Sequence, residues 1–442
     1  MTTADRRWAA HLLRRAGFGA GPDELDTYAA LGYEGAVNRL LSPNQVDDSD
    51  TQNLLADTTS ALDPDANIVD GQALWLTRML YTKRPLQEKM SLFWHNHFAT
   101  GVQKVKYPPL MYAQNQLFLS KALGKFDDLL SGVAHDPAMI FWLDNNTNVK
   151  GHPNENWGRE VMELFTIGIG NYTEQDVKEN ARAFTGWSAT QDGNFRFLAN
   201  RHDTGSKTIL GHTGNFNGDD VLKILVNMRQ TGTFLGRKMW RWFVNDTPST
   251  DGVNRLADVY MQSGHDITAM LRALFLSDDF RSEANYFATV KNPPEFVVGL
   301  LKQTGAAAAM RGSLDPNTLR LIARSVSSMS MMLFNPPNVA GWPGGRSWIN
   351  PGTYFARTTF AEQLLGLRAG GQPVTDIGRI AGAIGGSDAA SRVANTLEWA
   401  MPAAPAAPLQ QDLTAYLGSG SNPVKTAGLL RLVFSSPSYQ LN

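Results

Sequence analysis

Residues 73–98 read ALWLTRMLYTKRPLQEKMSLFWHNHF, and they indicate the fold class more clearly than the rest of the chain. Apolar residues recur at helical spacing on both sides of Pro85. A proline is tolerated in the first turn of a helix, because its missing N–H would have no intrahelical partner there. The stretch therefore predicts two consecutive helices, 73–82 and 85–98.

The same periodicity extends in both directions from this stretch. Residues 43–70 interrupt it, with seven Asp and no Lys or Arg, and are expected to form a solvated loop. Helices are expected at 6–15, 22–30, 33–41, 109–120, 126–135, 154–167 and 173–184, with helical periodicity from 219 to about 333. The fold class predicted is all-α: a large multi-helical domain with a small β-hairpin insertion and long Pro/Gly-rich loops.

Two internal segments depart from the helical pattern. Asp192-Gly193, flanked by alternating apolar residues, predicts a hairpin within an insertion at about 187–212. Residues 334–351, FNPPNVAGWPGGRSWINP, contain too much Pro and Gly for a helix and predict a long ordered loop. We expect residues 1–400 to form one helical domain, and residues 401–442 to form a helical extension packed on it after a Pro/Ala-rich linker at 402–408.

The composition of the 442 residues excludes several classes of function. The 40 Lys and Arg nearly balance the 41 Asp and Glu, so a basic surface for nucleic acid or for an anionic membrane is not expected. Cysteine is absent, which excludes disulfides, thiolate metal sites and cysteine nucleophiles. No apolar run is long enough to span a membrane. The first residues do not read as a secretory signal, so the localisation stays open on composition alone.

The strongest candidate site follows a loop rich in Asn and Asp. On a helix, Glu155, Arg159, Glu160 and Glu163 share one face, opposite a face that is entirely apolar. Such a face is either a solvated ladder of ion pairs or one wall of a polar pocket. The density of amide and carboxylate side chains before the helix favours the pocket, and its candidate binding residues are Asp144, Asn154 and Asn156.

Three further segments supply candidate residues. His95 and His97 form a His-x-His pair, a combination found in metal sites, although a histidine in an apolar helix is more often a core residue. Residues 200–212 place His202, Asp203 and Lys207 on a loop after the hairpin. The loop 334–351 carries tryptophans that either stack on a sugar ring or plug the helical core. Its candidates are Asn338, Trp342 and Trp348, and Trp187 is added from the start of the hairpin.

At these segments the sequence resembles a bacterial family, the domain of unknown function 1800. The resemblance implies an all-helical fold, and it favours a periplasmic or secreted location because family members often carry export signals. It also implies that the protein acts on glycans in the cell envelope or outside the cell, and that it is associated with a sulfatase-like partner protein. The matching runs are HLLRRAGFG, RPLQEKMSLFWHNHFAT, DNNTNVKGHPNENWGREVMELF (with Val161 where the family usually has Leu), GNYTEQDVKENARAFTGW, HDTGSKTILG and FNPPNVAGWPGG.

The leading hypothesis is a glycan-active hydrolase that needs no cofactor. Glycoside hydrolysis uses two carboxyl groups, one protonated and one ionised. Glu160 or Glu163 would pair with Asp203 or Asp144, Glu155 is a further catalytic candidate, and Arg159 would hold one carboxylate ionised. Tryptophans, with the amides, would line the cleft for the carbohydrate substrate.

Two alternatives stay open. The first is a helical enzyme dependent on a divalent metal ion, with ligands from His95, His97 and His202 together with Glu160 and Glu163. The second is a non-catalytic glycan-binding or envelope scaffold protein whose charged helix faces are only ion-pair ladders.

Overall fold

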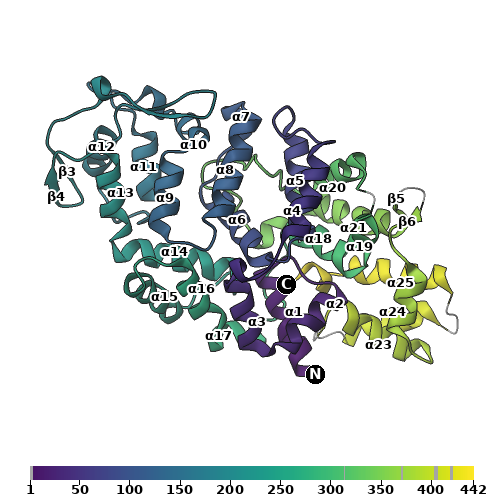
Figure 1. Ribbon diagram of the computed structural model, residues 1–442. Helices are drawn as coiled ribbons and strands as arrows, with labels where there is room; N and C mark the ends of the chain where they lie inside the picture. The colour runs from purple at the N-terminus through teal and green to yellow at the C-terminus, as the bar shows by residue number, and fades with distance from the viewer. Residues whose placement is uncertain (1–2, 313, 370–371, 403–406, 419–421) are drawn as a thin grey trace.

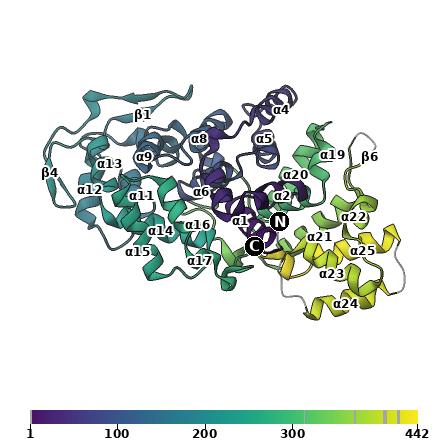
Figure 2. The same cartoon turned by 60° about the horizontal axis from the view of Figure 1, so that its bottom comes forward.

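The computed structural model describes residues 3–312, 314–369, 372–402, 407–418 and 422–442. Over these residues it contains 25 α-helices, and its sheets are short and two-stranded, so the predicted all-α class is confirmed (Figure 1). The helices fall into a central group, α1–α8, flanked on one side by α9–α17 and on the other by α18–α25. Figure 2 shows the same separation from a second direction.

The described helices follow one another along the chain in these three groups. The central group comprises α1 (Thr3–Ala16), α2 (Pro22–Ala30), α3 (Gly32–Leu41), α4 (Ser49–Thr59), α5 (Ile68–Tyr81), α6 (Pro85–His97), α7 (Val102–Val105) and α8 (Pro108–Ser120). The second group comprises α9 (Phe126–Ala134), α10 (Pro137–Trp142), α11 (Glu155–Glu163), α12 (Glu174–Ala183), α13 (Gly218–Val226), α14 (Arg229–Phe243), α15 (Thr250–Gln262), α16 (Ile267–Phe275) and α17 (Asp278–Arg281). The third comprises α18 (Pro293–Gln303), α19 (Ala306–Met310), α20 (Pro316–Ser328), α21 (Pro351–Gly366), α22 (Ile377–Ile384), α23 (Ala389–Ala400), α24 (Ala407–Leu417) and α25 (Pro423–Phe434).

The core consists of two hydrophobic clusters, and α6 contributes to both. Phe93 and Trp94 pack in the first cluster with α9, α11 and α14–α16, whereas Leu92 packs in the second with α5 and α18–α25. Nearly every side chain of α6 is buried, and its buried charged residues are paired, Glu88 with Arg78 and Lys89 with Glu295. The centre of the molecule therefore lies at α6. Helices α24 and α25 pack on α21–α23, and residues 403–406 of the expected linker lie outside the described residues.

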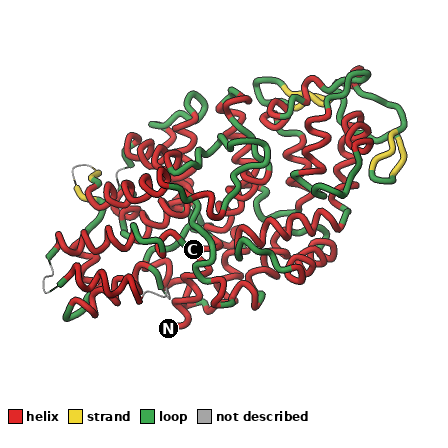
Figure 3. The backbone as a smooth tube through the Cα atoms, turned by 180° about the vertical axis from the view of Figure 1, so that it is seen from behind, coloured by secondary structure: helices red, strands yellow, loops and turns green. Residues whose placement is uncertain are grey.

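The expected hairpin is present, and a second one follows it. Strand β1 (Trp187–Ala189) pairs antiparallel with β2 (Phe195–Phe197), as the Asp-Gly turn predicts. Strand β3 (Lys207–Ile209) pairs with β4 (His212–Gly214), and β5 (Arg368–Ala369) with β6 (Gln372–Pro373). The β3–β4 turn places Leu210 at φ 51°, a conformation that is unfavourable for leucine, so its sequence lacks the usual signal. Figure 3 shows the strands confined to opposite ends of the molecule.

The expectation of a solvated loop at 43–70 is wrong in part, because α4 and the start of α5 occupy it. Two of its aspartates are buried and engaged by other segments. Asp48 accepts hydrogen bonds from the Thr51 and Thr82 hydroxyls, and Asp70 pairs with Arg320 at 2.6 Å. The aspartates thus serve as partners for distant groups, which a pattern read along the chain does not reveal.

Candidate functional site

A cavity of about 250 Å³ lies at the centre of the molecule, where the end of α6 meets α14, the start of α18 and the loop 334–351. Its position depends on that loop, which crosses the last turn of α6. The side chains and main-chain segments that line it include Phe93, Asn96, His97, Lys238, Arg241, Trp242, Asp246, Asn292, Glu295, Ala340, Trp342, Pro343, Gly344, Gly345 and Trp348.

Two contacts hold the loop 334–351 against α6. The Oδ1 atom of Asn96 accepts a hydrogen bond from the Trp342 N–H at 2.7 Å. Gly341 adopts φ 83°, and a Cβ atom there would lie 2.4 Å from the main-chain oxygen of Asn96. Only glycine fits such a close approach in a left-handed conformation. The loop is therefore an ordered wall of the cavity.

Aromatic rings form much of this wall. Trp342 and Trp348 are only 6% and 5% exposed, and they pack in the second core cluster while they also line the cavity. The two expected roles of these tryptophans, core plug and ring surface for a ligand, are thus not exclusive. On the opposite side Trp242 joins them, and its Nε1 atom is buried without a hydrogen-bond partner. A buried indole N–H usually has an acceptor, and this one has none among the described residues.

His97 and Lys238 form a polar pair at one end of the cavity. The Nε2 atom of His97 lies 3.0 Å from the main-chain oxygen of Phe165, and Nδ1 lies 3.1 Å from Nζ of Lys238. Since a carbonyl can only accept, Nε2 carries the proton and Nδ1 accepts from the lysine. Burial, and then the charge of Lys238, lowers the pKa of His97 well below its usual value. The imidazole is therefore neutral and orients the ammonium group.

The charges around the cavity are mixed in sign. Burial lowers the pKa of Lys238 to about 8, so its charge depends on pH close to neutrality. Arg241, which is exposed, adds a permanent cation. Asp246 supplies an exposed carboxylate beside Gly345. Glu295 is already occupied, since it accepts from Lys89, from the Asn292 N–H and from the Asn442 amide.

The histidines of the metal alternative do not come together. His95 accepts a hydrogen bond from the Phe334 N–H at 3.1 Å, and the Nδ1 atom of His202 lies 2.9 Å from the main-chain oxygen of Thr185. With the His97 contact, all three rings are thus positioned by main-chain groups. Among the described residues, no three His, Cys, Asp or Glu side chains are grouped so that they could hold a metal ion.

The carboxylate face of α11 lies in the second group of helices. Arg159 contacts Glu155 at 3.3 Å and Glu174 of α12 at 2.7 Å, and the Glu174 hydrogen bond raises the pKa of the guanidinium. Glu163 accepts a hydrogen bond from the Tyr172 hydroxyl. The pair of Arg159 and Glu163, expected from the helix spacing, is replaced by these two contacts. Three of the predicted residues therefore lie in a ladder that is partly open to solvent.

Glu160 differs from its neighbours on this face. It is half-buried, and burial followed by the charge of Glu163 raises its pKa. Glu163, in contrast, accepts a hydrogen bond from the Tyr172 hydroxyl. Two adjacent carboxyl groups thus lie in different environments, which is the condition for an acid and a base in one site.

The polar residues before α11 are occupied by the protein itself. Asn154 caps the helix by accepting from the Asn156 N–H, and its amide donates to the Thr147 hydroxyl at 2.9 Å. Asp144 contacts Lys104 at 2.7 Å and the Asn156 amide at 3.2 Å. The density of Asn and Asp at this position is therefore explained by helix capping and loop closure.

The loop 200–212 is internally bonded as well. Arg182 of α12 binds both carboxylate oxygens of Asp203, at 2.8 and 3.2 Å, and lowers the pKa of that carboxyl to about 2. The ammonium group of Lys207 donates to the main-chain oxygens of Asp203 and Gly205. Arg182 binds Asp203 at the end of α12, whereas Arg159 of α11 contacts Glu174 at the start of α12, about 12 Å away along the helix axis. Both carboxylate oxygens of Asp203 are therefore already paired with Arg182.

The predicted residues thus divide into two regions. Trp187 is buried against Phe184 and Phe195 in the first core cluster, on the side of α11 and the hairpins. Asn338 bonds the Ala340 N–H at 2.9 Å and belongs to the loop beside the cavity, with Trp342 and Trp348. The cavity described above has none of Glu155, Glu160 or Glu163 in its lining.

Comparison with known proteins identifies the family but no activity. Residues 11–441 match the family described as protein of unknown function (DUF1800). The chain belongs to this family. No curated protein and no solved structure matches it. The expected family resemblance is therefore confirmed, and it extends over nearly the whole chain of this DUF1800 protein.

Several cavity residues of this DUF1800 protein were not identified from the sequence. Lys238, Arg241 and Trp242 lie on α14 within the run KMWRWF, where two cations alternate with two tryptophans. That combination is a usable signal for a polar aromatic site, although it resembles an ordinary amphipathic helix. Among the described helices, none is long and apolar enough to cross a membrane, as the sequence predicts.

Proposed function

We propose that this protein is carbohydrate-active and that the central cavity binds one ring of an acidic sugar. The observation that carries the proposal is the combination of three indole rings with two cations around one cavity, from Trp242, Trp342 and Trp348 and from Lys238 and Arg241. Aromatic faces stack on the apolar faces of sugar rings. The volume of about 250 Å³ is close to the lower limit of about 300 Å³ for small-molecule sites, which suits one ring.

The cations favour an acidic over a neutral sugar. Lys238 and Arg241 can both approach a carboxylate or sulfate group, and a hydrogen bond to a charged group contributes about 1.5–3 kcal/mol. Asp246 and Asn96 supply acceptors for ring hydroxyls. A sulfated or uronic acid glycan also fits the association with sulfatase-like proteins that the family resemblance implies.

Binding of defined oligosaccharides tests this proposal. Chondroitin tetrasaccharide, with and without sulfate, and neutral cellotetraose would be titrated into the protein, with heat and tryptophan fluorescence as readouts. We expect the acidic ligands to bind and Lys238→Met to weaken them about 10- to 100-fold. Arg237→Gln is the matched control, because Arg237 is exposed on the same helix and is not part of the lining. Equal binding of neutral and acidic ligands, or binding to none, contradicts the proposal.

Glycoside hydrolysis by residues of α11 is a second candidate function. It is favoured by the different environments of the Glu160 and Glu163 carboxyl groups. Burial and the charge of Glu163 raise the pKa of Glu160, whereas Glu163 accepts a hydrogen bond from the Tyr172 hydroxyl. We expect Glu160→Gln and Glu163→Gln to lower the release of reducing ends from the same tetrasaccharides by 100-fold or more. Glu174→Gln, at the exposed end of the ladder, is the control.

The remaining alternatives are separated by the same experiments. Unchanged hydrolysis in both variants would remove the α11 carboxylates from catalysis, and binding that is never followed by turnover would favour a glycan-binding or scaffold protein. Elemental analysis of the purified protein addresses the divalent-metal enzyme, which requires a stoichiometric metal ion.

A further inference from the structure

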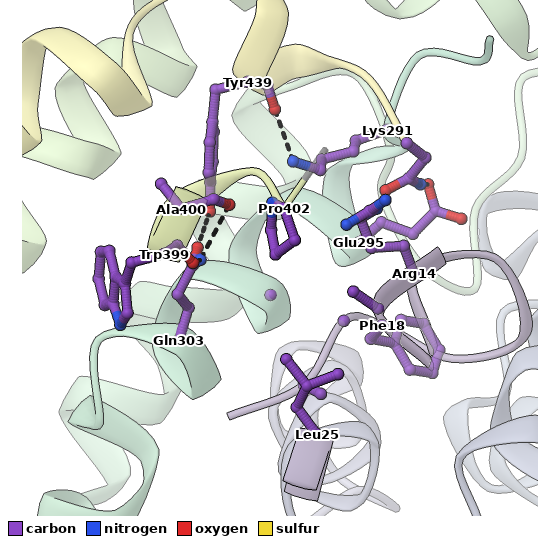
Figure 4. Close-up of a pocket in the computed structure, with 15 residues that line it drawn as sticks. Arg14, Phe18, Leu25, Lys291, Glu295, Gln303, Trp399, Ala400, Pro402 and Tyr439 are labelled. Atoms are coloured by element: carbon purple, nitrogen blue, oxygen red, sulfur yellow. Dashed lines mark hydrogen bonds between the residues drawn. The ribbon is translucent and has the colours of Figure 1, made fainter. Parts of the chain in front are cut away.

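A second, smaller cavity lies on the other side of Glu295, between α1, α18 and the end of the chain. Its volume is about 60 Å³, and its polar lining comes from Arg14, Lys291, Glu295, Gln303, Tyr439 and Asn442. Figure 4 shows Arg14, Lys291 and Glu295 together at one end of this cavity, away from Gln303. The space admits a few water molecules or a small ion, and it is too small for a sugar ring.

The surroundings of this cavity hold far more positive than negative charge. One carboxylate, that of Glu295, is buried among several cations, and it is already bonded to Lys89. The buried cations are Arg14, Arg15, Lys89, Lys291 and Arg357. Buried charges that lack a counter-charge destabilise a fold, so buried cations in excess need a negatively charged partner.

Three of the five cations have two acceptors each. Arg15 donates to the main-chain oxygens of Phe243 and Val244, both at 2.8 Å. Lys89 binds Glu295 and the Gly17 oxygen. Arg357 donates to the Lys291 oxygen at 2.7 Å and to the Gln440 side chain at 3.3 Å. These contacts fix the three side chains, and of their donors only Nε of Arg357 is buried without a partner among the described residues.

Arg14 and Lys291 are different. The Nε and Nη2 atoms of Arg14 are buried without a hydrogen-bond partner, while its guanidinium stacks on Phe287 at 4.4 Å. The ammonium group of Lys291 has three N–H donors, and within the described part of the chain its one acceptor is the Tyr439 oxygen at 2.6 Å. Both side chains line the same small cavity, and both keep donors without an acceptor among the described residues.

The electrostatics of Arg14 and Lys291 also favours a negatively charged partner in this cavity. Burial lowers the pKa of Lys291 well below its usual value, and the charges of Arg14 and Arg357 lower it further. Burial also lowers the pKa of Arg14 to about 10. Each of these cations would gain from an anion placed between them, because the anion removes mutual repulsion and replaces lost hydration.

We propose that this cavity is a binding site for a small tetrahedral oxyanion, phosphate or sulfate, held between Arg14 and Lys291. The planar fork of an arginine matches two oxygens of such an anion, and a lysine binds it as a point charge. Glu295 does not oppose the anion strongly, since its charge is compensated by Lys89. The site is separate from the sugar cavity and does not depend on the function proposed for it.

The test uses the full chain, dialysed into chloride buffer. Anions released by acid denaturation would be measured by ion chromatography, and thermal unfolding would be followed at millimolar phosphate or sulfate and constant ionic strength. We expect either a stoichiometric anion carried through purification or a rise in Tm of several degrees above the chloride value. The two salts tell which oxyanion is preferred.

Variants separate a binding site from a structural role. Arg14→Gln should abolish the anion-dependent rise in Tm, while in chloride alone it should be at least as stable as the natural protein because repulsion is removed. Lys291→Met provides the same test if Arg14→Gln does not fold, and Arg324→Gln, at an exposed position of α20, is the control. Absence of both released anion and anion-specific stabilisation overturns the proposal, as does an equal rise in Tm in Arg14→Gln.

Discussion

The central cavity and the carboxylate face of α11 use the same kinds of side chains under opposite solvent conditions. In the cavity, the largest influence on the pKa values of Lys238 and His97 is burial, which lowers both. On α11, the largest influence on the pKa of Arg159 is a hydrogen bond to the exposed Glu174, which raises it. Charges that are exposed are already satisfied by neighbours or by water, whereas charges that are buried require a specific partner.

The two regions also differ in how they are assembled. The residues of the α11 face lie within 20 positions of each other, from Glu155 to Glu174. The cavity combines α6, α14, α18 and the loop 334–351. The first and the last of these segments are more than 100 residues apart in the chain. A local charge pattern therefore marks a solvated helix face more readily than a binding site.

The largest expected difference between the regions is in stability. Glu295→Gln removes the carboxylate that compensates Lys89, and breaking a buried ion pair from one side costs about 3–5 kcal/mol. Glu174→Gln, at the exposed ladder, should cause no measurable loss. Urea denaturation of the two variants measures both effects, and equal losses would show that the regions do not differ in burial as described.

A glycine pair tests whether the cavity wall depends on close packing. In Gly341→Ala the new Cβ atom meets the Asn96 main chain, so we expect a loss of about 2–5 kcal/mol from backbone strain and steric overlap together. Gly344→Ala is the control, because Gly344 also has a positive φ but nothing lies within 4 Å. The φ of 75° and ψ of −167° at Gly344 lie in a region open almost only to glycine, so this variant should lose about 1–3 kcal/mol from backbone strain alone in the same denaturation experiment. Similar losses would mean that the contact with α6 is not required.

The pH dependence of stability should reveal Lys238. Its pKa in the folded protein is about 8, below the value of about 10.4 in an unfolded chain. Between these values the unfolded state binds the extra proton, so the stability of the natural protein should rise with pH relative to Lys238→Met. The expected rise is on the order of 1–3 kcal/mol between pH 8 and 10. A constant difference between the two proteins would contradict a buried ammonium group.

The smallest effect on stability is expected at Glu160. Here stability should change with pH in the direction opposite to that expected for Lys238. The folded pKa of Glu160 is raised, so the folded state binds the extra proton and stability falls as pH rises through that pKa. Glu160→Gln should therefore be as stable as the natural protein at pH 7, or more stable by up to about 1 kcal/mol. Glu163→Gln should lose stability slightly, because Tyr172 loses its charged acceptor. Thermal unfolding at pH 5 and 7 separates the two.

The helices were predictable from the sequence because their signals are local. The paired helices at 73–98 appear as α5 and α6, and the helix expected at 173–184 appears as α12, which begins with a capping box of Thr173 and Asp176. The second hairpin was missed because its turn uses Leu210 at a positive φ. For the site, the sequence identified Trp342, Trp348 and His97 individually, but not Lys238 or Arg241, which became significant only through the segments that surround them.

The sequence by itself determined the helical class, the family and the exclusion of thiol chemistry, because periodicity, motif and composition are properties of the chain. The tertiary structure decided which charges are buried. Asp203 and Glu160 are both acidic residues near polar neighbours in the sequence, yet one is neutralised by Arg182 and the other is partly desolvated beside Glu163. Arg14 and Lys291 lie 277 positions apart and face one cavity. Desolvation and charge pairing depend on distance in space, and that distance is set only when the helices pack.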